Sequence, residues 1–151
     1  GYQNSGQLGL NGPVNSQRSS PTQIPGTTWA TGKGKHVSCR GRSAAIRTDG
    51  TLWTWGSNYY ATLGHNQHTG NISSPTQVPG TTWNTVHMSP QLTFATKTDG
   101  TLFGWGDSGT YGPLGQNSTV RYSSPVQIPG TWSSIVAGIY HIYATRKLLT
   151  D

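Results

Sequence analysis

The chain has 151 residues, a formal net charge of +6 and a charged fraction of only 9%, with no glutamate and 21 glycines. Abundant glycine, serine, threonine and asparagine favour short strands and turns over helices, so we expect an all-β protein with almost no helix. The single cysteine, Cys39, excludes a disulfide within the chain, and no apolar run approaches the roughly 18 residues of a membrane-spanning helix. The positive charge is compatible with phosphate or acidic partners but identifies none.

Three copies of one sequence unit follow each other along the chain. SSPTQIPGTTW from Ser19 returns as SSPTQVPGTTW from Ser73 and as SSPVQIPGTW from Ser123. Such a period indicates a solenoid, a propeller or another array, in which each unit buries its apolar face against its neighbours. We place the repeat phases at approximately residues 1–55, 56–105 and 106–151, within one continuous segment.

Each copy predicts two strands separated by a tight turn. The proline of Ser-Ser-Pro begins a strand or lies at a sheet edge, because it has no N–H for a central ladder. The Pro-Gly pair that follows predicts the turn. A tryptophan then opens the next strand at Trp83 and Trp132, and Trp29 is the repeat position that corresponds to them in the first copy.

A basic insertion follows the first of these tryptophans. Trp29 to Thr48 spans nineteen positions, whereas the matching interval from Trp83 to Thr98 spans fifteen. Its basic side chains are candidates for a binding site, because clustered cations favour phosphate or carboxylate partners. They are Lys33, Lys35, His36, Arg40 and Arg42. A solvated cluster that keeps strand edges apart is the alternative, and the lack of interleaved aromatics disfavours nucleic acid.

Two Asp-Gly pairs, Asp49-Gly50 and Asp99-Gly100, predict β-hairpins. In a two-residue type I′ turn both central residues need a positive φ, which these residues tolerate. Alternation along the next strand places two aromatic side chains on one face, for packing against a neighbouring sheet. These repeat-defining positions are Trp53, Trp55, Phe103 and Trp105, followed by Gly56 and Gly106.

Four tyrosines in loop segments form a second group of candidate binding residues: Tyr59, Tyr60, Tyr111 and Tyr122. Tyrosine commonly anchors protein interfaces. An exposed tyrosine in a bend is also ordinary, so both interpretations stay open.

No catalytic, metal or cofactor site is predicted. His65 and His68 lack a nearby Cys, Asp or Glu to complete a metal site. The segment Gly-Asp-Ser-Gly at 106–109 resembles the nucleophile segment of trypsin-like proteases, but Thr110 stands where that family has glycine. Cys39 has no recognisable activating neighbours. We therefore expect a protein that is not an enzyme.

These motifs together resemble the regulator of chromosome condensation repeat family. Its units carry Trp-Gly, an Asn-containing bend, Leu-Gly, a proline-initiated strand and a Gly-x-x-His segment before the Asp-Gly turn. Gly138 and His141 match that segment, whereas Arg42 and Leu92 stand at the histidine position of the other copies. The resemblance implies four antiparallel strands per blade and roughly seven blades in a closed ring. About three repeats make an incomplete propeller, to be completed by blades of the same longer chain or of other chains.

Three functions remain open. The first is a non-catalytic structural or interaction propeller that binds a protein or glycan through its blade loops, as an adhesive or virion or surface-appendage protein. The second, implied by the resemblance, is guanine-nucleotide exchange with chromatin docking. The third is an inhibitor-like propeller that covers an enzyme's active site. The weakly charged composition and near-identical copies favour the first, and an extracellular or virion location over a nuclear one.

Overall fold

The computed structural model describes residues 1–146 except 14, 110–111, 113 and 139–140. Within these residues every regular element is a strand, and no helix is long and apolar enough to cross a membrane. The strands are β1 (Tyr2–Gln3), β2 (Ser16–Gln17), β3 (His36–Cys39), β4 (Arg42–Ile46), β5 (Leu52–Gly56), β6 (Ile72–Gln77), β7 (Trp83–Met88), β8 (Leu92–Lys97), β9 (Leu102–Gly106), β10 (Tyr122–Ile128), β11 (Trp132–Ala137) and β12 (Ile142–Arg146).

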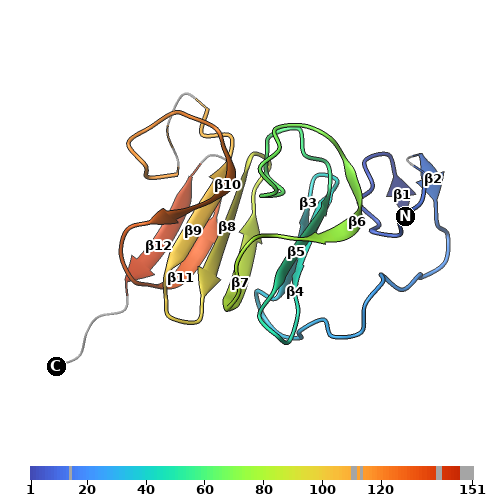
Figure 1. Ribbon diagram of the computed structural model, residues 1–151, viewed down its shortest axis with the longest axis horizontal. Helices are drawn as coiled ribbons and strands as arrows, with labels where there is room; N and C mark the ends of the chain where they lie inside the picture. The colour runs from blue at the N-terminus through green and yellow to red at the C-terminus, as the bar shows by residue number, and fades with distance from the viewer. Residues whose placement is uncertain (14, 110–111, 113, 139–140, 147–151) are drawn as a thin grey trace.

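The strands form two antiparallel four-stranded sheets flanked by two strand pairs. The sheets have the orders β3-β4-β5-β6 and β7-β8-β9-β10, and the pairs are β1-β2 and β11-β12. Figure 1 shows them side by side along the long axis, with β1-β2 at one end and β11-β12 at the other. Four consecutive antiparallel strands are the content of a propeller blade, so the predicted blades are confirmed, and the chain is an incomplete propeller.

Both Asp-Gly pairs lie in hairpins, but the predicted type I′ turn is wrong. Gly50 has a φ of 79°, whereas Asp49 is not among the residues with positive φ. Arg47 and Thr51 close the turn through an Arg47 N–H to Thr51 carbonyl bond of 2.9 Å, which leaves three residues in the loop. The Asp49 carboxylate accepts bonds from the N–H and hydroxyl of Thr51, at 2.9 and 2.6 Å, and these bonds stabilise the longer turn.

The aromatic strand faces serve two purposes. Trp53 and Phe103 pack within their own repeats, edge-on to Trp29 and Trp83 with ring centroids 6.4 and 5.3 Å apart. Trp105 is fully buried and belongs to a core shared with Leu52 of the preceding sheet. The predicted aromatic contact between neighbouring blades therefore depends on the second aromatic of each strand.

An indole hydrogen bond joins each Trp-Gly segment to a loop of the preceding blade. The Trp55 Nε1–H donates to the carbonyl of Gln7 at 3.0 Å, and the Trp105 Nε1–H donates to that of Thr62 at 2.8 Å. Gln7 and Thr62 occupy matching positions before Leu-Gly. This repeated bond fixes the spacing between successive blades.

The proline-initiated strands follow the prediction in two of the three copies. Pro75 and Pro125 lie in β6 and β10, which are edge strands with irregular registers. Residues 19–23 form no strand, so that part of the prediction is wrong.

Candidate functional site: a polar groove between two blades

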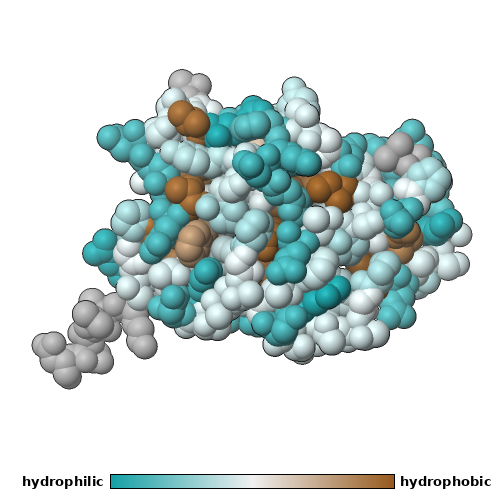
Figure 2. Space-filling view, viewed as in Figure 1, coloured by the Kyte–Doolittle hydropathy of each residue, from teal (hydrophilic) through white to brown (hydrophobic). Residues whose placement is uncertain are grey.

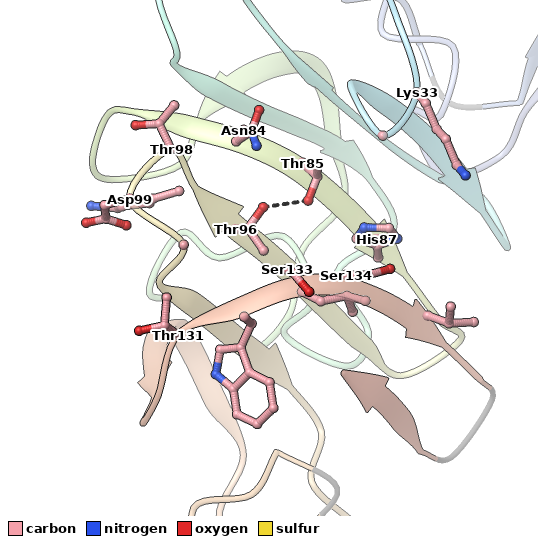
Figure 3. Close-up of a pocket in the computed structure, with 16 residues that line it drawn as sticks. Lys33, Asn84, Thr85, His87, Thr96, Thr98, Asp99, Thr131, Ser133 and Ser134 are labelled. Atoms are coloured by element: carbon pink, nitrogen blue, oxygen red, sulfur yellow. Dashed lines mark hydrogen bonds between the residues drawn. The ribbon is translucent and has the colours of Figure 1, made fainter. Parts of the chain in front are cut away.

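A groove of about 550 Å³ lies between β7 and β11, the edge strands of neighbouring sheets. Figure 3 shows Thr85 and Thr96 in its middle, with Asp99 towards one end and His87 towards the other. The polar side chains that line its walls are Asn84, Thr85, His87, Thr96, Ser133 and Ser134. Hydroxyl and amide groups therefore share this surface with the apolar side chains of Trp132, Ile135 and Val136.

The polar side chains in the middle of the groove are uncharged. The hydroxyls of Thr85 and Thr96 form a hydrogen bond of 2.6 Å. Burial lowers the pKa of the His87 imidazole, so the ring is neutral at pH 7 and can both donate and accept a hydrogen bond. The walls therefore suit a ligand with alternating donors and acceptors, such as a polypeptide backbone.

Charged side chains lie at the edges of the groove. Lys33 and Asp99 are both exposed and stand on different sides of it in Figure 3. Hydrogen bonds from Thr101 hold the pKa of the Asp99 carboxyl below its usual value. The Lys97 ammonium instead lies over the rings of Trp83 and Phe103, at 5.2 and 5.1 Å from their centroids.

The basic insertion fills the corresponding gap one blade earlier. In the first blade Trp29 forms a β-bridge with Arg47, and seven positions later His36 pairs with Ala45. In the second blade the matching residues are Trp83 and Val86, only three positions apart. This register confirms that the first blade holds four extra residues.

Residues of the insertion bind directly to β7. The carbonyl of Gly34 accepts a bond of 2.8 Å from the Val86 N–H. The Lys35 ammonium donates to the carbonyl and side-chain oxygens of Asn84, at 2.7 and 2.9 Å. Because the second blade has no such insertion, the gap between β7 and β11 remains open.

The predicted cationic residues are therefore divided between several environments. Lys33 lines the groove, Lys35 is bound to Asn84, and His36 and Arg40 are exposed in and after β3. Arg42 is only 3% exposed, so it lies in the protein interior rather than on a binding surface.

Arg42 connects parts of two blades. Its guanidinium donates hydrogen bonds to the carbonyls of Cys39 and Pro90 and to the hydroxyl of Thr62. Burial is the main cause that lowers its pKa. It stands at the position of His141, so a different residue type supplies packing and hydrogen bonds there.

The candidate tyrosines do not line the groove. Tyr59 is 69% exposed and packs edge-on against Tyr60, with ring centroids 4.8 Å apart. Tyr122 is half-buried in β10 and packs against the cores on both sides of its sheet. Tyr111 lies outside the described residues.

The candidate metal ligands are not brought together. The His65 ring forms a 2.8 Å hydrogen bond with the Thr54 hydroxyl. Over the part of the chain that the structure describes, no three His, Cys, Asp or Glu residues are grouped as metal ligands would be.

Sequence reasoning missed the polar groove residues of β7 and β11. Thr85, His87, Ser133 and Ser134 carry no motif and are ordinary strand residues. The one available signal was indirect: the insertion that fills the first gap is missing from the second repeat.

Comparison with known proteins agrees with this architecture. The profile of the Regulator of chromosome condensation (RCC1) repeat matches residues 49–95 and 99–145. A search of curated protein sequences finds no match.

Among solved structures, human WBSCR16 is similar with a TM-score of 0.73 and 20% identity, over 94% of this chain and 38% of that one. Prp20p from Saccharomyces cerevisiae gives a TM-score of 0.71 and 17% identity, over 87% of this chain and 33% of that one. The yeast protein in its complex with Kap60 gives a TM-score of 0.67 and 18% identity, over 87% and 32%. The chain thus spans about a third of the length of these proteins. Since the family profile covers more than half of its residues, the chain belongs to the RCC1 repeat family.

Proposed function

We propose that this chain is part of a propeller that binds a protein partner through the groove between β7 and β11 and catalyses no reaction. The observation that carries the proposal is the groove itself, with hydroxyls, an amide and a neutral imidazole on its walls. Such groups match the donors and acceptors of a polypeptide.

The surface chemistry supports a polar contact. Figure 2 shows that hydrophobic side chains on one face form small separate patches among hydrophilic ones. A large continuous apolar patch would instead favour a hydrophobic interface. A rigid scaffold with a polar groove at an edge strand suits a reversible protein contact.

Two of the similar structures are of a protein that binds other proteins. This supports a protein, rather than another kind of molecule, as the partner of this chain. One concerns the binding of Prp20p to Gsp1p and histones, and another shows Kap60 bound to the yeast protein. At under 20% identity these names do not identify this chain's partner. An adhesive role, a glycan ligand, completion by further blades and an extracellular or virion location stay predictions from composition and repeat number.

The proposal is tested by blocking the groove. Ser133 and Ser134 are exposed on β11, so the double variant Ser133→Arg/Ser134→Arg fills the groove without disturbing the core. Ser19→Arg/Ser20→Arg is the matched control, because it adds the same charge at exposed positions outside the groove.

The tagged chain and both variants are used to capture partners from the source cells, followed by quantitative mass spectrometry. We expect a protein that the wild type and the control retain and the groove variant loses. A partner set retained equally by all three proteins contradicts the proposal.

A further inference from the structure

The chain contains its own example of how a groove of this type is filled. Between β3 and β7 the insertion fills the space. The Gly34 carbonyl accepts a hydrogen bond from the Val86 N–H, and the Lys35 ammonium donates to oxygens of Asn84. Between β7 and β11 the corresponding space is the open groove. The first contact can therefore serve as a template for the second.

The strand registers make this comparison residue by residue. Trp83 pairs with Lys97 and Trp132 pairs with Arg146, at the same point of the two repeats. The next residue is Asn84 in β7 and Ser133 in β11.

The same register continues through the contact residues. Thr85 pairs with Thr96, and Ser134 pairs with Thr145. One position further, Ile135 corresponds to Val86. By this register the N–H of Ile135 corresponds to the Val86 N–H, and Ile135 lines the open groove.

We propose that the groove binds a turn of a basic peptide in which a glycine is followed by a lysine. The glycine carbonyl accepts a bond from the Ile135 N–H, and the lysine ammonium binds the carbonyl and hydroxyl oxygens of Ser133. Asp99 lines the same groove together with Lys33 and Lys97, and its carboxylate favours a cation close to it. This ligand assignment rests on the proposed function, that the groove is a protein-binding site.

The template also gives the reason for the glycine. Gly34 has a φ of +77°, and a Cβ on it would lie 3.1 Å from the Cβ of Thr85. A side chain at this position would therefore be strained and crowded. In the open groove Ser134 takes the place of Thr85, so a side-chain Cβ stands at the matching position of the wall.

A synthetic peptide of residues 30–37, Ala-Thr-Gly-Lys-Gly-Lys-His-Val, is the probe. Its binding to the full chain is measured by fluorescence polarisation of a labelled peptide. Two altered peptides carry Gly34→Val or Lys35→Glu. The protein variants are Ser133→Arg/Ser134→Arg and its control Ser19→Arg/Ser20→Arg, with folding verified by circular dichroism.

We expect the wild type and the control to bind the peptide equally, and the groove variant to bind at least about tenfold more weakly, as the loss of one charged hydrogen bond would produce. Each altered peptide should bind the wild-type protein more weakly than the parent peptide by a similar factor. This comparison needs no protein variant. Undetectable binding of the parent peptide, or binding that is indifferent to Gly34 and Lys35 or to the groove substitutions, overturns the assignment.

The two proposals fail separately. If the peptide does not bind but partner capture still depends on Ser133 and Ser134, the groove is a protein-binding site and only the ligand class is wrong. The peptide could also depend on its glycine and lysine and yet bind the groove variant as tightly as the wild type. It would then have displaced the insertion between β3 and β7, and this result also refutes the assignment.

Discussion

Substitution of Gly64 by alanine tests how successive blades are held together. Gly64 is buried with a φ of +80°, and an added Cβ would lie 2.9 Å from Nε1 and 3.1 Å from Cε2 of Trp105. That indole donates to the Thr62 carbonyl at 2.8 Å. The methyl group therefore cannot be accommodated without moving the ring and weakening its hydrogen bond.

Gly115 provides the matched control. It has a similar φ of +65°, but it is exposed and the nearest atom to an added Cβ is Ile128 Cγ2 at 3.9 Å. Alanine at either site pays a left-handed backbone penalty of about 1 to 2 kcal/mol. Only Gly64→Ala adds overpacking and the disturbed bond to the buried carbonyl, together about 2 to 4 kcal/mol.

Urea unfolding followed by tryptophan fluorescence measures the difference. With an m-value of about 2 kcal/mol/M, the midpoint of Gly64→Ala should lie about 1 to 2 M below that of Gly115→Ala. Repeat proteins can unfold in more than one step, so the transitions must be compared by a second probe such as circular dichroism. Equal midpoints for the two variants would refute the role given to the indole contact.

Three further outcomes follow from buried or hydrogen-bonded groups. Arg42→Ala should lower the free energy of unfolding by about 1 to 3 kcal/mol in urea titrations, because the Pro90 carbonyl loses its donor; an unchanged midpoint would contradict this. The Asp99 pKa is lowered by Thr101, so its stabilisation is present above the unfolded pKa of about 3.9 and is lost as the pH falls through the folded pKa. Asp99→Asn should reduce the acid dependence of the urea midpoint, and an identical pH profile would argue against it. Burial lowers the pKa of His87, so its protonation should destabilise the fold as the pH falls below about 6.5; NMR titration of the ring should give a midpoint below that value, and His87→Gln should flatten the stability profile there.

Much of the fold could be predicted from local patterns. Asp-Gly pairs flanked by alternating residues located the hairpins β4-β5 and β8-β9. The same alternation placed Trp55 and Trp105 on the faces that meet the preceding blade. These features depend on residues close in sequence, which is why periodicity was sufficient.

The site could not be predicted in the same way, because it depends on contacts between blades. Lys35 and Asn84 are 49 positions apart, and nothing local indicates that one binds the other. Arg42 has the charge of a surface residue, yet its partners come from two distant turns. The groove is open because the second blade lacks the four extra residues that fill the gap in the first blade. This becomes visible only when the positions of both blades are known.

A photo-crosslinking amino acid at position 134 would report directly on whether the groove is the binding surface. Ser134 lines the groove, whereas Ser20 is exposed elsewhere and serves as the reference position. The protein is incubated with extract of the source cells and irradiated, and its adducts are identified by mass spectrometry. We predict a specific partner adduct from position 134 that is absent from position 20. Adducts from position 20 alone, or the same adducts from both positions, would contradict the assignment of the groove as the binding site.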